Sequence, residues 1–328
     1  MKKAILVLGA PRSGTSVISH VIHKLGVDFG NHDRFVDPKV HAFNPIFFEL
    51  QSLNNLNDEI FAYFSKKFTN FDWVPSEGDF GNEVIAKFEK KITEFIDDEF
   101  SKSKTIGLKD TRFCFTLPIW DVVLKRLGFD VRYVLTRRFA NSVFVSNKAV
   151  SINYSSEVNF RMVVQSTLLA RHYLEAKKHV IVRYEDLLAD PDQSILRLCD
   201  GLSLDRALTG EARSVISEDL NHQKRKADLF IYNYFESVID SDSVSPDEYL
   251  RYREIFLAAT SEKDQRIASL SQALGEREEQ LVNLGITLSK RDSQVASLNH
   301  AVTERDGQIT SFNQAVTDRD GQIASLNH

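Results

Sequence analysis

The chain begins with an apolar run followed by a loop whose glycines and cation could bind a phosphate. Residues 4–8 are all apolar, and residues 9–16 read Gly-Ala-Pro-Arg-Ser-Gly-Thr-Ser. Apolar residues then recur at helical spacing, so the pattern predicts a strand, a glycine-bounded turn and a helix. Gly9 and Gly14 would let the backbone approach an anion, and the N–H groups of the first helical turn would point at it. The alternative is a polar strand-to-helix turn that binds no ligand.

The loop differs from the nucleoside-triphosphatase pattern at one position. Its glycine spacing and the hydroxyl of Ser16 match G-x-x-x-x-G-K-[ST], but Thr15 occupies the lysine position, and Arg12 is the only cation in the loop. The sequence resembles instead the 5′-phosphosulfate loop of sulfotransferases that use 3′-phosphoadenosine-5′-phosphosulfate (PAPS). Two alternatives stay open: a triphosphate-dependent kinase with a degenerate loop, and a scaffold that binds nucleotide without turnover.

A second cluster follows the strand predicted over residues 131–136. Arg138 precedes Ser146 by eight residues, which is the spacing at which sulfotransferases hold the 3′-phosphate of the cofactor. A guanidinium offers paired donors to a phosphate, and a hydroxyl can add another. The chain departs from the family by placing Ala140 where proline is usual, and Arg137 competes with Arg138 for the role. The alternative is a surface arginine at a helix N-terminus.

The resemblance implies a cofactor site made of both clusters, with PAPS as sulfonyl donor and no metal. The residues that would bind the cofactor are Arg12, Ser13, Gly14, Thr15, Ser16, Arg138 and Ser146.

A third cluster, Lys109-Asp110-Thr111-Arg112, follows the short apolar run 105–108. It is similar to the Lys-Asp-Pro-Arg segment of a bacterial sulfotransferase-like group, with threonine in place of proline. Lys109 and Arg112 could neutralise charge on the transferring group or bind the acceptor. The alternative is an internal salt-bridge cluster that braces the loop.

The acceptor hydroxyl also needs a proton acceptor. Glu49 follows Phe47 and Phe48, an arrangement that resembles the base of some bacterial sulfotransferases, although the usual preceding glycine is missing. His41 competes as the base, and Glu49 could instead be an ordinary surface carboxylate. Glu49, Arg12 and Lys109 are therefore the predicted catalytic residues.

Two further segments accompany these clusters. Tyr184-Glu185-Asp186-Leu187 looks like a segment found across sulfotransferases, and its predicted role is to order the loop behind the cofactor. Its adjacent carboxylates have no further ligand at metal-binding spacing. The basic run 221–226 would offer Lys224 or Arg225 to the 3′-phosphate, or would be a solvated charge run.

Strands alternate with helices along the first part of the chain, which predicts an α/β fold with a parallel sheet and helices on both faces. Each charged cluster comes directly after a strand, and ligands of such sheets bind beyond the carboxyl ends of the strands. We expect a sulfotransferase-like domain over residues 1–238, a linker and helix over 239–260, and a heptad-repeat region over 261–328.

The last region repeats a 14-residue unit, seen in Arg291-Asp292, Arg305-Asp306 and Arg319-Asp320. Its apolar residues form a heptad series in which alternate d positions hold arginine. A two- or three-stranded coiled coil, which would join copies of this chain into a homo-oligomer, is one interpretation. The other is a partly helical tethering tail, because arginines lie on the seam and glycines weaken the helix.

The composition limits the classes of binding partner and the cellular compartment that we expect for this protein. A net charge of −5 gives no electrostatic reason to expect nucleic acid as a partner. The sequence contains no run of about 20 apolar residues, so we expect no transmembrane helix. Cys114 and Cys199 are far apart, which suggests reduced thiols in a cytoplasmic protein. The expected function is a cytoplasmic sulfotransferase that moves a sulfonyl group from PAPS to an acceptor hydroxyl, on a carbohydrate.

Overall fold

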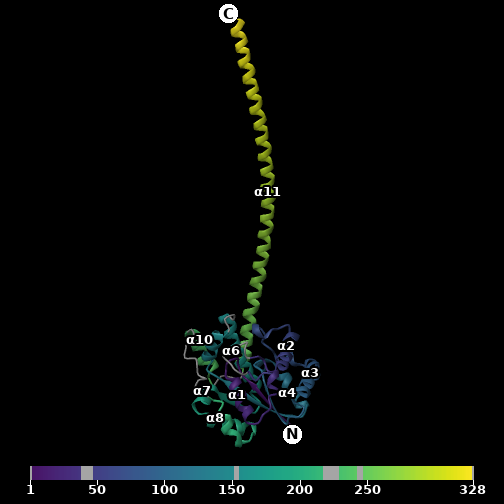
Figure 1. Cartoon of the computed structure of the whole chain (residues 1–328), viewed down its shortest axis with the longest axis vertical. Helices are drawn as coiled ribbons and strands as arrows, with labels where there is room; N and C mark the ends of the chain where they lie inside the picture. The colour runs from purple at the N-terminus through teal and green to yellow at the C-terminus, as the bar shows by residue number, and fades with distance from the viewer. Residues whose placement is uncertain (1, 38–46, 151–154, 217–228, 242–246, 327–328) are drawn as a thin grey trace. The chain divides into compact units, whose positions relative to one another are not determined.

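The computed structural model describes residues 2–37, 47–150, 155–216, 229–241 and 247–326. The chain divides into two compact units, Met1–Ile255 and Phe256–His328. The first unit contains the sheet and the helices around it, and the second is helical (Figure 1). The domain ranges expected from the sequence stay a prediction.

The sheet has four parallel strands in the order β2-β1-β3-β4. Strand β1 (Lys2–Leu8) lies between β2 (Thr105–Lys109) and β3 (Phe129–Arg137), and β4 (His179–Arg183) pairs with β3. The register aligns Val7 with Lys109 and Leu8 with Leu135. The three clusters that follow β1, β2 and β3 therefore begin at the same edge of the sheet, as predicted.

Alternate residues of the strands pack on opposite faces of the sheet, which explains the continuous apolar runs. Leu6 and Leu8 join a core with α2, α3, α4 and α6, whereas Ile5 and Val7 join a core with α1, α8 and α9. The predicted α/β fold is thus confirmed.

The helices are α1 Thr15–Lys24, α2 Gln51–Tyr63, α3 Asn82–Phe100, α4 Phe113–Arg126, α5 Ala140–Val150, α6 Ser156–Leu174, α7 Tyr184–Ala189, α8 Pro191–Leu202, α9 Thr209–Arg213, α10 Leu229–Tyr234 and α11 Glu248–Leu326, with a π-helix η7 at Phe235–Ile239.

Helix α4 begins at Phe113, and Pro118 lies inside it rather than in its first turn, where proline is favoured. Asp110 starts the helix, since its carboxylate accepts from Arg112 N (2.8 Å) and its carbonyl accepts from Phe113 N (3.1 Å). Phe113 and Phe115 are fully buried, and this packing outweighs the missing N–H of the proline.

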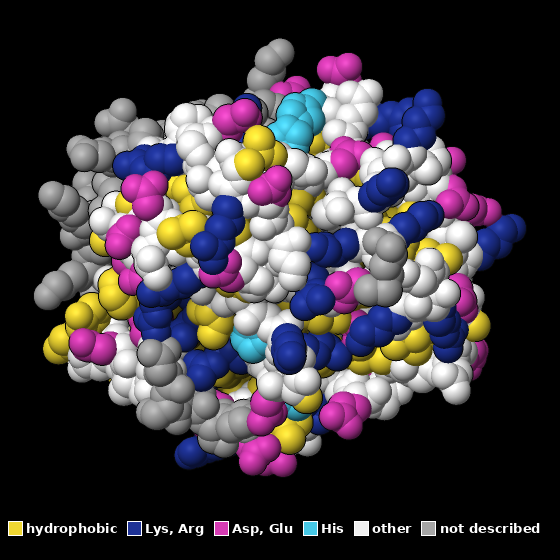
Figure 2. Space-filling model, turned by 90° about the horizontal axis from the view of Figure 1, so that it is seen from below, with side chains coloured by type: hydrophobic (Ala, Val, Ile, Leu, Met, Phe, Trp, Pro, Cys, Tyr) yellow, Lys and Arg dark blue, Asp and Glu magenta, His cyan; other side chains and the backbone are white. Residues whose placement is uncertain are grey.

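Helix α11 is a single helix of 79 residues. None of the helices in the described part of the chain is long and apolar enough to cross a membrane. On the face of the protein seen in Figure 2, Lys and Arg side chains lie among Asp and Glu side chains.

Candidate active site

The loop between β1 and α1 has the backbone conformation that its glycines predicted. Gly9 has φ +153°, Gly14 has φ +97°, and Arg12 itself adopts a left-handed φ of +72°. A Cβ on Gly14 would lie 2.6 Å from a ring carbon of Tyr184. Glycine is therefore required at position 14 both for its backbone angle and for the close approach of the tyrosine.

Neither the cap nor the first turn of α1 contains an acidic residue. Gly14 is its N-cap, and no side chain caps it. Ser13 N donates within the loop to the carbonyl of Ala10 (3.0 Å). The amides of Gly14, Thr15 and Ser16 continue the loop into the first turn of the helix, where backbone N–H groups attract an anion.

The loop is fixed to β3 through hydroxyl groups. The hydroxyls of Ser13 and Thr136 lie 2.8 Å apart, and Thr136 donates to the carbonyl of Leu8 (3.1 Å). Sequence reasoning missed Thr136 as a site residue. A polar residue at the end of an apolar strand was the available signal, because β3 ends at the same edge as β1.

The second predicted cluster lies against the loop. Arg12 Nε donates to the hydroxyl of Ser146 on α5 (3.2 Å). Arg138 Nη1 lies 3.4 Å from the carbonyl of Arg12, and its guanidinium lies 4.6 Å from the centre of the Tyr184 ring. Three segments that are distant in the sequence thus meet here, and Tyr184 lies against both Arg138 and Gly14.

Arg12 and Arg138 form a cationic pair without a carboxylate. Burial lowers the pKa of Arg12, the nearby Arg138 lowers it further, and Tyr184 acts in the opposite direction. Neither guanidinium makes an ion pair with a carboxylate within the described part of the chain. Two cations held together with no protein counter-charge make a favourable place for an anion.

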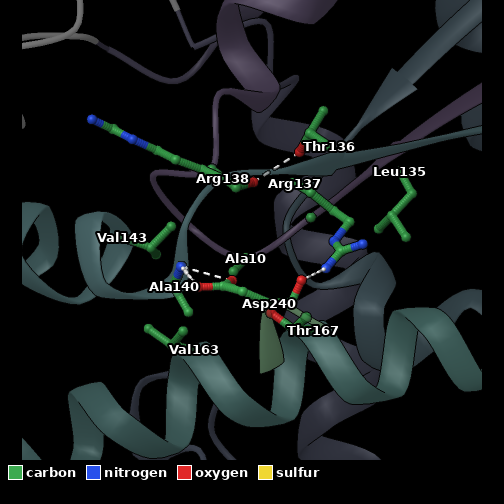
Figure 3. A pocket seen from close by; sticks show the side chains of 12 residues that line it. Ala10, Leu135, Thr136, Arg137, Arg138, Ala140, Val143, Val163, Thr167 and Asp240 are labelled. Atoms are coloured by element: carbon green, nitrogen blue, oxygen red, sulfur yellow. Dashed lines mark hydrogen bonds between the residues drawn. The ribbon is translucent and has the colours of Figure 1, made fainter. Parts of the chain in front are cut away.

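Arg137 has a different environment from its neighbour. Its Nη2 donates to the carbonyls of Ile239 (3.3 Å) and Asp240 (3.1 Å), and the residue is largely buried. Figure 3 shows the side chains of Arg137 and Arg138 pointing in opposite directions from the end of β3. Of the two candidates, only Arg138 lies against the loop.

Asp240 is a half-buried residue beside this site that the sequence had placed in a linker. Its carboxylate accepts from the backbone N–H of Ala140 at 3.0 and 3.1 Å, so it caps α5 (Figure 3). Burial raises its pKa to about 6, while the bond from Ala140 and the charge of Arg137 oppose the rise. Asp240 shares a small pocket with Gly9, Ser13 and Arg138. The residues that follow Asp240 in the sequence are small and polar, so the sequence did not indicate that this side chain would pack against the site.

The predicted catalytic residues Glu49 and Lys109 form an ion pair with each other. The ammonium group is buried, with the Lys109 side chain only 2% exposed, and Glu49 Oε2 also accepts from Asn54 Nδ2 (3.1 Å). The competing base, His41, lies outside the described residues, as do Lys224 and Arg225.

The residues after Lys109 form an internal network, which favours the bracing role for this part of the cluster. Asp110 is fully buried and accepts from Asn57 Nδ2 (2.8 Å) and Arg112 Nη1 (3.2 Å). Burial raises the pKa of Asp110, and the charge of Arg112 lowers it. Arg112 also donates to Asp58 (2.8 Å), so its guanidinium is committed to two carboxylates.

The aromatic residues before Glu49 include a core side chain. Phe48 is 2% exposed, and its ring lies 5.0 Å from His20 and 5.6 Å from Phe29. A surface on which a sugar could stack is therefore not formed by Phe48. No group of three or more His, Cys, Asp or Glu residues that could hold a metal occurs among the described residues.

Comparison with known proteins gives only distant similarities. No protein-family model matches the chain, and no curated protein matches it. The sulfotransferase domain of the Synechococcus PCC 7002 olefin synthase is 16% identical with a TM-score of 0.37, over 78% of this chain and 96% of that chain. Sulfotransferase STF9 from Mycobacterium avium is 13% identical with a TM-score of 0.40, over 69% of each chain. A sugar kinase from a Janibacter species is 16% identical with a TM-score of 0.33, over 63% of this chain and 98% of that chain.

Solved sulfotransferases are thus among the structures to which this chain is similar, as its motifs had suggested.

Proposed function

We propose that this protein is a sulfotransferase that binds PAPS at the loop of residues 9–16. The observation that supports this most strongly is the pair of guanidinium groups, Arg12 and Arg138, at the open N-terminus of α1 without a carboxylate. Two cations on different segments suit a nucleotide with two separate anionic groups, which is the chemistry of a 3′,5′-bisphosphorylated adenosine.

The residues present fit such a ligand. In this proposal, Arg12 binds the 5′-phosphosulfate together with the amides of Gly14, Thr15 and Ser16. Arg138 and Ser146 bind the 3′-phosphate. Thr15 replaces the lysine that reaches the outer phosphates of a triphosphate, and therefore ATP is the less suitable ligand. No metal takes part in the proposed reaction.

The reaction forms a bond between the acceptor oxygen and sulfur and breaks the bond between sulfur and the bridging oxygen of the phosphate. Arg12 and the N-terminus of α1 stabilise the negative charge that gathers on the leaving phosphate. Glu49, which forms an ion pair with Lys109, accepts the proton of the attacking hydroxyl as general base. Carbohydrates are the acceptor class that we propose to test first.

The first test is a thermal titration with adenosine 3′,5′-bisphosphate, with adenosine 5′-monophosphate and with ATP and magnesium. We expect the bisphosphate to stabilise the protein by about 2.7 kcal/mol over the ligand-free state at 100 times its Kd, and the monophosphate to stabilise it less at the same concentration. Stabilisation by ATP and magnesium without stabilisation by the bisphosphate would show that the sulfotransferase proposal is wrong and that a kinase is the better assignment.

A transfer assay then separates an enzyme from a scaffold. Labelled PAPS is supplied with sugar, lipid and phenol acceptors, and transfer of the sulfonyl group is measured. Tight binding of the bisphosphate with no transfer to any acceptor would favour a domain that binds nucleotide without turnover.

A further inference from the structure

Helix α11 exposes an apolar residue at every seventh position from residue 267 onward. All of these side chains are more than half exposed, and they would occupy the a positions of a heptad repeat. A stripe of this length on an exposed helix buries nothing within its own unit, so it is a surface for a partner. The a residues are Ile267, Leu274, Leu281, Leu288, Val295, Val302, Ile309, Val316 and Ile323.

The d positions alternate between apolar residues and arginines. Each arginine is followed directly, at the e position, by an acidic residue. The arginine–acid pairs are Arg277–Glu278, Arg291–Asp292, Arg305–Asp306 and Arg319–Asp320. The heptads with an apolar d residue have an uncharged e residue instead, namely Ser271, Gly285, Asn299 and Asn313. Acidic residues thus occur at e only where d is arginine.

These charges are not paired within the single helix. Adjacent residues of a helix point in different directions, so Arg291 and Asp292 cannot face each other. Arg277 donates to the amide oxygen of Gln280 (3.0 Å), and none of the four arginines makes an ion pair with a carboxylate in the described part of the chain. These charges are therefore available to pair with the charges of another helix.

We propose that residues 267–323 form a parallel, in-register coiled coil with a second copy of this chain. In a parallel pair, each d side chain inserts beside the e′ residue of the same heptad in the partner. Arg291 would then meet the partner's Asp292, and the same contact recurs in each arginine layer.

The opposite orientation is disfavoured by the same charges. An antiparallel pair places e positions against e′ positions, so that acids such as Asp292 and Asp306 would approach acids of the partner. It also packs the d arginines against apolar a′ residues. The first contact is repulsive, and the second leaves the charge of an arginine without a partner. Both contacts therefore disfavour the antiparallel orientation.

The register is fixed by the 14-residue period. A slip of one heptad places arginine layers opposite apolar layers and moves the e′ acids away from the arginines. A slip of two heptads restores the pairs but leaves two heptads of each helix without a partner. The alternation therefore encodes one alignment, at some loss of stability relative to an all-apolar seam.

The residue types favour two strands. Five successive a positions from Val295 to Ile323 are β-branched, and Leu298 lies at d, a combination that favours dimers. A dimer also leaves the edge of each d layer near solvent, where an arginine can extend its charged end. The four glycines of the region, at 275, 285, 307 and 321, all lie outside a and d.

Charge reversal tests the pairing. Wild-type protein is expected to sediment at twice the 37.4 kDa mass of the chain. R291E/R305E and D292K/D306K should each weaken self-association by at least tenfold, because like charges would meet. An equimolar mixture of the two variants should form a heterodimer, since the reversed charges then complement each other. K290E/E304K carries the same kinds of reversal at outward c positions and should behave as wild type.

A cysteine tests the orientation. Oxidation of the L270C variant should link two chains quantitatively, because only a parallel, in-register pair brings these d positions together. Near-ultraviolet circular dichroism of each variant should match that of wild type and so confirm that the first unit is folded. A monomeric wild type, a trimer, failure of the variant mixture to associate, or no L270C cross-link in the dimer would overturn the proposal.

Discussion

Arg137 and Arg138 show how much the position of a single side chain decides at this site. They are adjacent in sequence and chemically identical, yet Arg137 binds backbone carbonyls of residues 239 and 240 while Arg138 lies over Tyr184 against the loop. Arg137 is the last residue of β3, whereas Arg138 lies in the turn that leads to α5. This difference in backbone position, rather than any property of arginine, makes Arg138 the candidate ligand.

Arg138→Ala is predicted to weaken binding of adenosine 3′,5′-bisphosphate at least tenfold, because one guanidinium–phosphate contact is lost. Its effect on adenosine 5′-monophosphate should be small. Isothermal titration with both ligands measures the difference. Arg132→Ala, on the same strand but paired with Asp130, is the matched control and should bind as wild type. Equal affinity in wild type and a folded Arg138→Ala variant would remove Arg138 from the site.

Gly14→Ala is predicted to destabilise the protein by about 3 kcal/mol. The substitution combines a left-handed backbone angle with a Cβ placed 2.6 Å from the Tyr184 ring. Urea unfolding followed by tryptophan fluorescence measures the change.

Gly81→Ala is the control for this prediction, since Gly81 is also a helix N-cap. It has φ −63° and nothing within 4 Å of an added Cβ, and should change stability little. Similar losses in both variants would contradict the explanation.

At the scale of elements, α5 connects the two halves of the proposed site. Arg138, two residues before its start, and its own Ser146 contact the loop, and its N-terminus is capped from two directions. Glu185 accepts from Phe139 N (3.1 Å), and Asp240 accepts from Ala140 N. The protein's own carboxylates thus hold the start of α5, whereas α1 has no side-chain cap and no acidic residue in its first turn.

Asp240 is predicted to make stability depend on pH between about 4 and 6. Its pKa is about 6 in the folded protein against an ordinary value of 3.8, so the folded state retains the proton more tightly. The stability from this group is present below pH 4 and is lost as the pH rises to about 6. Arg137, Glu185 and Arg183 are the charged groups that face it.

The measurement compares wild type with Asp240→Asn, which keeps an oxygen that can accept from Ala140 but does not titrate. The stability of the variant relative to wild type should rise by on the order of 2 kcal/mol from pH 4 to pH 6 and then remain constant. Other titrating groups cancel in this difference. A difference that is flat over this range would contradict the assignment.

At the scale of the whole molecule, the two units obtain their stability in different ways. The first has its own core on both faces of the sheet, whereas apolar residues of the second, such as Leu281 and Phe312, are exposed. Helices gain most of their stability from packing. The second unit therefore depends on its proposed partner.

Helix unfolding is accordingly predicted to depend on protein concentration. A tenfold increase in concentration stabilises a dimer by about 1.4 kcal/mol, so part of the far-ultraviolet circular dichroism loss should move to higher temperature. The near-ultraviolet signal of the aromatic core in the first unit should not move. Two transitions that are both independent of concentration would argue against association through α11.

The sequence by itself determined the parallel α/β fold, the strand-loop-helix at residues 2–24 and the edge at which the charged clusters begin. These follow from local patterns, since apolar periodicity specifies elements and parallel strands place their carboxyl ends together. The heptad pattern likewise predicted a helix at the end of the chain. The assignment of Arg12, Arg138 and Ser146 to a cofactor remains a prediction that their proximity supports.

Only the tertiary structure decided which groups pair. It joined Glu49 to Lys109, turned Arg137 away from the loop, and brought Asp240 from an expected linker to the start of α5. Each of these contacts links residues at least 60 positions apart. Local periodicity carries no information about such contacts, because they depend on how distant segments pack against one another.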